Sequence, residues 1–155
     1  MIKKFIDAAY REAEAAKAEG NVPVGAVIVR NGEIISYGKN GRLPLCHAET
    51  EAINNACKKL NTKILCGCDI YVTLEPCPMC AGAIMLSGID NVYFGAYDSE
   101  YGACQSKDNM FARYKNIKKV GIYGGICEDK CKALITGYFK EKRKTNENEK
   151  KETQR

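Results

Sequence analysis

The apolar positions at the start of the chain repeat with the period of a helix, and those that follow fit a pair of strands. In residues 2–18 they recur three or four places apart, at Ile2, Phe5, Ile6, Ala9, Ala13 and Ala16. This spacing predicts a helix with one buried face, ended by Gly20 and Asn21. The runs VGAVIVR and EIISYG then flank Asn31-Gly32, which is the strongest short turn signal for a β-hairpin.

Helices and strands alternate through the rest of the chain. After His47, apolar residues at intervals of four predict a helix, and they are Ala48, Ala52, Ala56 and Leu60. The expected elements that follow are a strand at 69–74, a helix at 77–87 ended by Gly88, strands at 91–95 and 118–123, and a helix from about 128 to 143. Such alternation is typical of an α/β fold with parallel strands between helical layers. The long connection from Tyr97 to about Asn116 is of a kind that is usually functional.

Length and composition describe one globular domain. The chain has 155 residues, of which 45% are hydrophobic and 28% charged, and this balance excludes a disordered or membrane-spanning protein. Its longest apolar runs are far too short to cross a bilayer. The charged N-terminal stretch lacks the apolar core of a secretory signal. We therefore expect a cytoplasmic protein with no membrane contact.

The end of the chain differs in character from the rest. Residues 144–155 are polar and of low complexity, so we expect one domain over residues 1–143 and a basic, disordered tail over 144–155. From Lys140 to Arg155 there are seven basic and four acidic side chains. This excess of positive charge would attract phosphate groups, although a frayed, solvated C-terminus is the simpler explanation.

Nine cysteines are spread along the chain, and two of them stand out. An odd number with no sign of export argues against a disulfide framework, so we expect thiols that are buried, bind metal or react. Cys77 and Cys80 lie in LEPCPMC, between a predicted strand and the first turn of a helix. Three positions apart, they share one helix face, and the amides of a helix N-terminus favour thiolates. The pair alone is compatible with a metal site, a redox pair or chance.

The single histidine of the chain, His47, offers this pair a third ligand. It begins the preceding predicted helix, and the strand at 69–74 returns the chain, so both helix starts can meet at one edge of the sheet. Two thiolates and an imidazole suit zinc and leave the fourth tetrahedral position for water. Cys46 is the nearest candidate for a fourth, structural ligand, but adjacent residues at a helix start point in different directions.

Glu49 follows His47 by two residues and could carry protons. A carboxylate beside a zinc-bound water can accept its proton and return it to a leaving group, whereas a first-turn glutamate without a metal merely complements the helix dipole. Residues 47–49 and 76–80 together reproduce the H-x-E…P-C-x-x-C signature of zinc-dependent nucleobase deaminases. A zinc-stabilised binding module without activity is the alternative from another class.

Beyond this signature, residues 22 to about 144 resemble the bacterial tRNA-specific adenosine deaminases. The resembling stretches are VPVGAV, HAE, YVTLEPCPMCAGA, VYFGAYD and GGICEDKC. The resemblance implies a cytidine-deaminase-like fold, an α/β/α sandwich of three layers with a mixed five-stranded sheet, and a homodimer. It implies hydrolytic conversion of the wobble adenosine of a tRNA anticodon to inosine, with Zn²⁺ as cofactor and the anticodon loop as partner. His47, Cys77 and Cys80 are then the metal ligands and Glu49 the catalytic proton shuttle.

The resemblance also implies substrate contacts. It places Asn40, at the end of the second predicted strand, against the target base, although KNG by itself predicts only a turn. Asp98, directly after VYFGAY, would contact the nucleotide at the pocket mouth. Backbone amides near Pro76 and Cys77 would help to hold the charge that develops on the substrate.

Three departures from the family pattern bear on the substrate. LPLC at 43–46 lacks the acidic residue that usually precedes HAE, Gln105 stands where the long loop usually has glycine, and Lys118 stands where histidine is common. They leave the reaction type unchanged but keep a free nucleobase or nucleoside (guanine, adenine or cytosine) open as a second substrate class. Tyr97 and Tyr101 in the long loop could stack on bases or pack the loop onto the domain.

Overall fold

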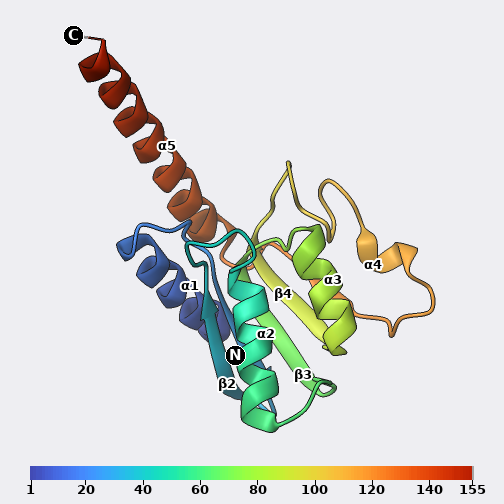
Figure 1. Ribbon diagram of the computed structural model, residues 1–155. Helices are drawn as coiled ribbons and strands as arrows, with labels where there is room; N and C mark the ends of the chain where they lie inside the picture. The colour runs from blue at the N-terminus through green and yellow to red at the C-terminus, as the bar shows by residue number, and fades with distance from the viewer. Residues whose placement is uncertain (155) are drawn as a thin grey trace.

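A mixed five-stranded sheet forms the centre of the protein, as a computed structural model describes it over residues 1–154 (Figure 1). In spatial order β2-β1-β3-β4-β5, the strands are β1 (Gly25–Arg30), β2 (Glu33–Lys39), β3 (Cys68–Leu74), β4 (Asn91–Ala96) and β5 (Gly121–Tyr123). β1 is antiparallel to both of its neighbours, whereas β3, β4 and β5 are parallel. The expected mixed sheet is confirmed, although β5 is shorter than the predicted strand at 118–123.

Helices cover both faces of this sheet (Figure 1). They are α1 (Ile2–Ala18), α2 (Ala48–Leu60), α3 (Pro78–Ser87), the short α4 (Met110–Arg113) in the long connection, and α5 (Glu128–Thr153). α2 and α3 bury apolar side chains against one face, and α1 and the start of α5 against the other. The sequence of β1 is almost continuously apolar because both faces of this strand are buried. Ala26 and Ile28 pack under α2, while Val27 and Val29 pack under α1. The predicted three-layer arrangement is confirmed.

The hairpin between β1 and β2 forms at the predicted dipeptide. Asn31 and Gly32 both have positive φ, at 51° and 77°, and Arg30 pairs with Glu33 on either side of them. Asparagine and glycine tolerate this left-handed backbone best, and a two-residue turn of this kind matches the natural twist of the strands.

A glycine allows α2 to lie unusually close to β2. A Cβ atom on Gly38 would lie 2.1 Å from the carbonyl oxygen of Ala48 and 2.5 Å from the amide nitrogen of Ala52. A side chain at this position would therefore push the first turn of α2 away from the sheet. α1 approaches β1 in the same way at Gly25.

The last helix is longer than its sequence suggests. We expected disorder over residues 144–155, but α5 continues as a helix to Thr153, with exposed side chains beyond Arg143. Lysine and glutamate are good helix formers, and Glu147 lies four residues before Lys151, where opposite charges support a helix. Low complexity was therefore a poor guide to this segment. The domain limit at residue 143 remains a prediction.

Two general features of the chain can be checked directly. Within residues 1–154, no helix combines the length and apolar character needed to cross a bilayer. All nine cysteines are free thiols, as expected for a protein that does not depend on disulfides.

The close contact at Gly38 predicts a large cost for a small substitution. Gly38→Ala should lower the free energy of unfolding by about 1–3 kcal/mol, because the methyl group overlaps backbone atoms of α2. The matched control is Gly137→Ala in α5, where a Cβ meets nothing within 4 Å and should stabilise by about 0.5–1 kcal/mol. Urea unfolding of both variants measures the difference, and equal effects would contradict this account of the packing.

Candidate active site

Two helix starts converge at the edge of the sheet where β2 and β3 end. His47 is the N-cap of α2 and Cys77 is the N-cap of α3, both with extended backbone. Lys39 and Val72 pair with adjacent residues of β1, so the two strands reach the same edge. Pro78 is tolerated at the start of α3 because a first-turn residue has no helical partner for its amide. The expected meeting of the two helix starts is confirmed.

His47, Cys77 and Cys80 form a compact group of metal-ligating side chains. The Nδ1 atom of His47 lies 3.7 Å from Sγ of Cys77 and 3.5 Å from Sγ of Cys80, and the three ligand atoms all lie within 4.8 Å of one another. Zinc bonds of about 2.3 Å to sulfur and about 2.0 Å to nitrogen, at tetrahedral angles, separate these ligands by about 3.5 Å. The observed spacing therefore fits a zinc ion.

The two thiols of this group differ strongly in proton affinity. A hydrogen bond from the Cys80 thiol, aided by the His47 imidazole, outweighs burial and lowers the pKa of Cys77 to about 4. The same hydrogen bond, together with burial, raises the pKa of Cys80. The contact with Cys77 in turn raises the pKa of His47. A metal ion would compete with protons for these same sulfur and nitrogen atoms.

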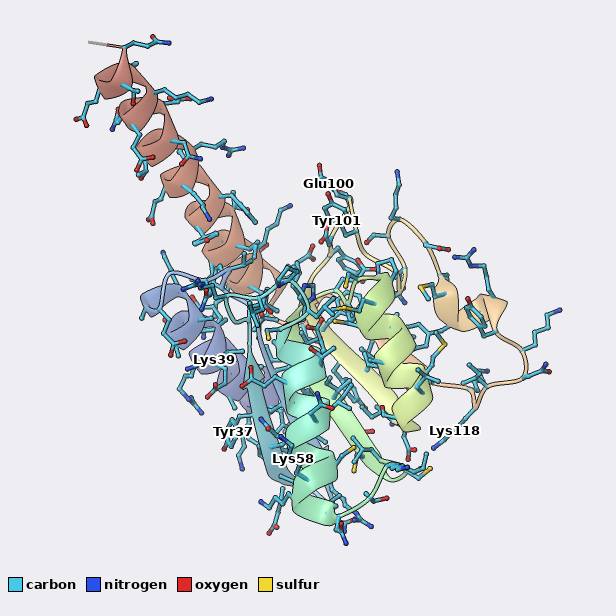
Figure 2. All side chains as sticks on the ribbon, viewed as in Figure 1. Tyr37, Lys39, Lys58, Glu100, Tyr101 and Lys118 are labelled. Carbon is cyan, nitrogen blue, oxygen red and sulfur yellow. The ribbon has the colours of Figure 1, made fainter. Side chains whose placement is uncertain are left out.

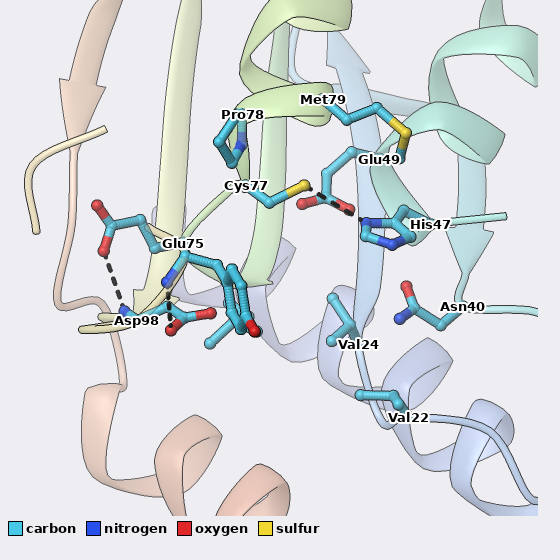
Figure 3. Close-up of a pocket in the computed structure, with 12 residues that line it drawn as sticks. Val22, Val24, Asn40, His47, Glu49, Glu75, Cys77, Pro78, Met79 and Asp98 are labelled. Carbon is cyan, nitrogen blue, oxygen red and sulfur yellow. Dashed lines mark hydrogen bonds between the residues drawn. The ribbon is translucent and has the colours of Figure 1, made fainter. Parts of the chain in front are cut away.

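Glu49 is buried beside this group, on the first turn of α2. Only 4% of its surface is exposed, and burial is the main reason that its pKa rises to about 7. In Figure 3 its carboxyl group lies next to the contact between Cys77 and His47. A carboxyl group that titrates near neutrality can both accept and release a proton at physiological pH.

His47, Cys77 and Cys80 supply three metal ligands, so a fourth tetrahedral position is left for a ligand that is not a protein side chain. They form the one cluster of three metal-ligating residues among those described, 1–154. Cys46 is exposed and lies outside the cluster, which agrees with the expected divergence of adjacent side chains. A closed structural zinc site has four protein ligands, whereas three are typical of a catalytic site.

A pocket of about 460 Å³ opens over the group (Figure 3), a size typical of ligand sites. Its floor is made by His47 and Cys77, with Glu49 beside them. Apolar side chains supply much of the wall, namely Val22, Val24, Leu74, Pro78 and Met79. None of these wall residues was expected from the sequence. The apolar walls suit a flat aromatic ring whose reacting atom faces the polar floor.

Both residues expected to contact the substrate, Asn40 and Asp98, line this pocket. The Oδ1 atom of Asn40 accepts a hydrogen bond of 2.8 Å from the amide of Ala48, so its Nδ2 atom is left as a donor toward another partner. Oδ1 of Asp98 accepts hydrogen bonds from the amides of Glu100 and Tyr101, at 3.0 and 3.1 Å, and so holds a turn at the pocket mouth. Their contacts with a substrate remain predictions.

The turn at Pro76 and Cys77 contributes less to the pocket than expected. The carbonyl of Pro76 accepts a hydrogen bond of 2.9 Å from the amide of Ala103, and proline has no amide hydrogen of its own. Backbone support of a developing charge would therefore fall to the Cys77 amide alone. This narrower role remains a prediction.

A second carboxylate, Glu75, is buried next to the site and was not expected from the sequence. Only 2% of its surface is exposed. Its two oxygens accept hydrogen bonds of 2.7–3.2 Å from the backbone amides of Asp98, Cys104, Gln105 and Ser106, and another from the Ser106 hydroxyl. Burial alone would raise the pKa of Glu75, but these hydrogen bonds, the hydroxyl foremost, lower it. The one sequence signal was an acidic residue between a buried strand and a proline.

The three departures noted in the sequence can now be placed. The backbone amide of Gln105 donates a hydrogen bond to the carboxylate of Glu75, and any residue except proline supplies such an amide. Lys118 forms an ion pair with Asp90, and Figure 2 shows it far from Tyr101 at the pocket mouth. Residues 43–46 form an exposed turn that leads into α2. None of the three disturbs the metal-ligating group.

Comparison with known proteins agrees with this geometry. Residues 1–96 match the family model for the cytidine and deoxycytidylate deaminase zinc-binding region, and this range contains the whole metal-ligating group. A tRNA-specific adenosine deaminase of Bacillus subtilis (strain 168) is 40% identical over 144 residues, 90% of this chain and 89% of that protein. Its counterpart from Aquifex aeolicus (strain VF5) is 50% identical over 110 residues, 68% of this chain and 73% of that protein.

Solved structures extend the likeness to the fold. One from studies of A-to-I editing by tRNA:A34 deaminases at the wobble position of transfer RNA has a TM-score of 0.81 and 36% identity, covering 84% of this chain and 98% of that chain. A guanine deaminase from Bacillus subtilis has a TM-score of 0.59 and 36% identity, covering 74% of this chain and 76% of that chain. The expected cytidine-deaminase-like fold and the Zn²⁺ cofactor are confirmed. The chain belongs to the cytidine and deoxycytidylate deaminase family and, within it, to the tRNA-specific adenosine deaminases.

Proposed function

We propose that the protein is a zinc-dependent hydrolase that converts adenosine to inosine at the wobble position of a tRNA anticodon. The observation that carries this proposal is the group of His47, Cys77 and Cys80 with Glu49 buried beside it. Three of these residues, His47, Cys77 and Glu49, line an open pocket. The relatives that are tRNA-specific adenosine deaminases support the choice of substrate. We place the deaminase domain at residues 1–143.

Each side chain of this group has a task in the proposed reaction. His47, Cys77 and Cys80 would hold the zinc, which when bound supplies a water molecule acidic enough to attack near neutral pH. Glu49 would accept a proton from the attacking water and deliver it to the amino group of the base; as the water oxygen bonds to the ring carbon, the carbon–nitrogen bond breaks and the amino nitrogen leaves as ammonia. The Cys77 amide is the remaining backbone donor of this turn for charge that develops on the ring.

The walls of the pocket suit the base itself. Val24, Leu74 and Met79 present apolar surface to the faces of a ring. Because the Asn40 carbonyl is held by Ala48, the free Nδ2 group would donate to an acceptor atom of the base. This polarity fits a purine, whose ring nitrogens are acceptors.

The surroundings of the pocket favour a base presented by a longer strand. A second cavity, of about 320 Å³, shares Tyr101 with the pocket and has Lys132 and Phe139 of α5 on its other side. Farther along α5, Lys142 and Arg143 line another hollow. Aromatic rings and cations along one groove suit stacked bases and phosphates.

The end of α5 does not enclose the pocket. Beyond the hollow lined by Lys142 and Arg143, this helix projects away from the rest of the chain (Figure 1). A deaminase of small metabolites needs a closed pocket to hold its substrate, whereas a nucleotide within an RNA loop is held by its neighbours. An open pocket with a basic helix leading away from it supports an RNA substrate.

A free nucleobase is the second candidate substrate. The observation in its favour is the likeness to the guanine deaminase from Bacillus subtilis, at 36% identity. Its TM-score of 0.59 is lower than the 0.81 of the structure from the tRNA:A34 deaminase studies. The RNA substrate therefore stands first.

We further propose a cytoplasmic homodimer. A tRNA substrate and nine free cysteines support a reducing compartment. Leu43, Leu45 and Leu86 expose between 65% and 79% of their surfaces, and a second copy of the chain would bury such apolar side chains.

Glu49→Gln should separate chemistry from metal binding. Glutamine keeps the shape of the side chain but cannot carry the proton, so kcat should fall by about 10²–10⁴-fold with zinc retained. His47→Ala removes one of three ligands and should lose zinc and activity together. Zinc content and ammonia release are the measurements, and Glu51→Gln on the exposed side of the same helix is the control. Full activity of Glu49→Gln would contradict its role as proton carrier, whereas a wild-type protein that holds zinc and releases no ammonia from any substrate would favour the binding module.

The substrate can be identified by ammonia release from a panel. We expect inosine to form in an anticodon stem-loop with adenosine at the wobble position, while free guanine, adenine and cytosine stay unchanged. The loop supplies the neighbouring bases and phosphates that the groove along α5 would contact. Turnover of a free base with inert RNA would overturn the assignment in favour of the second candidate.

A further inference from the structure

We propose that Glu75 is a positioning residue for substrate recognition: its buried carboxylate assembles the loop of residues 98–106 into one side of the active-site pocket. This inference rests on the proposed function, because the loop is taken to contact the substrate. Glu75 lies between β3 and the first zinc-ligating cysteine, Cys77. One side chain thereby links the metal site to the pocket mouth.

Donors of the loop occupy all the hydrogen-bond acceptor sites of the Glu75 carboxylate. One oxygen accepts hydrogen bonds from the amides of Cys104, Gln105 and Ser106, and the other accepts from the amide of Asp98 and the Ser106 hydroxyl. A carboxylate offers about four lone pairs, so five donors leave none for a substrate. The buried Glu75 carboxylate thereby takes the place of the backbone carbonyl groups that would accept from these amides in a strand or helix.

Gly102 shows how closely the loop wraps around this charge. A Cβ atom on Gly102 would lie 2.3 Å from Oε2 of Glu75 and 2.4 Å from the carbonyl oxygen of Asp98. The amide of Gly102 donates to that same carbonyl at 2.9 Å. The loop is therefore built against the carboxylate itself.

The part of the loop anchored in this way reaches the substrate pocket. The Asp98 amide binds Glu75, and the Asp98 side chain in turn holds the amide of Tyr101. Asp98 (Figure 3) and Tyr101 both line the pocket. Tyr101 also lines the adjoining cavity beside α5. Glu75 thus controls where these two residues meet a substrate.

The two buried carboxylates of the site have different functions. Glu49 lies beside the metal ligands and is the candidate proton carrier, whereas Glu75 faces a shell of donors with no room for proton transfer. Loss of Glu75 should therefore weaken substrate binding more than it slows the chemical step.

The test compares Glu75→Gln with wild type in metal content, amide exchange and kinetics. The new NH₂ group would face donors of the loop and could not accept their hydrogen bonds. We therefore expect faster hydrogen exchange at the amides of Asp98 and residues 104–106. One zinc per chain should be retained. KM for the anticodon stem-loop should rise by about 10-fold or more while kcat changes by less than about 3-fold. Glu33→Gln, at the exposed first residue of β2, should alter none of these quantities.

A milder pair of variants keeps the test decisive if Glu75→Gln does not fold. Ser106→Ala removes one donor to Glu75 and should raise KM by about 3-fold. Ser106→Thr keeps the hydroxyl, so its KM should stay close to that of the wild-type protein. A fall in kcat at constant KM, or unchanged exchange in the loop, would overturn the proposal. Exchange and zinc content need no substrate, so failure of the RNA assignment is recognised separately, by a wild-type protein that releases no ammonia from the stem-loop.

Discussion

The close contact between Gly38 of β2 and the first turn of α2 is the constraint on which the rest of the site depends. A helix that lies this near a strand carries its first residues directly to the sheet edge, where the end of β3 delivers the cysteines of α3. His47 reaches both sulfur atoms only because α2 begins there. Asn40 reinforces the arrangement by accepting a hydrogen bond from Ala48, which ties the end of β2 to the same turn. The chemistry is thus set by backbone packing before any ligand binds.

Two buried glutamates near this helix start have environments that shift their pKa values in opposite directions. Burial dominates at Glu49 and raises its pKa to about 7, which suits proton transfer. Hydrogen-bond donors dominate at Glu75 and lower its pKa, which suits a permanent anion that organises a loop. The two side chains line one pocket but lie on different elements. In our proposal the same residue type therefore serves the reaction in one place and substrate recognition in the other.

Much of this protein was predictable from the order of its residues, and the misses have physical causes. His47, Glu49, Cys77 and Cys80 were singled out because metal chemistry needs particular residue types at particular spacings, and the structure brings them together. Glu75 was missed because its partners are backbone amides 23 to 31 positions away, and an amide leaves no trace in residue type. The departure at Gln105 is harmless in that loop for the same reason. The helix beyond residue 143 was missed because polar, repetitive composition indicates disorder, although its residues individually favour helix.

The central claim is that three side chains hold zinc and leave the fourth position for water. X-ray absorption at the zinc edge of the purified protein tests it most directly. The account predicts two sulfur ligands at about 2.3 Å and two lighter ligands, one imidazole nitrogen and one oxygen, at about 2.0–2.1 Å. A third sulfur ligand, or a protein that purifies without zinc and does not bind it when supplied, would contradict the account.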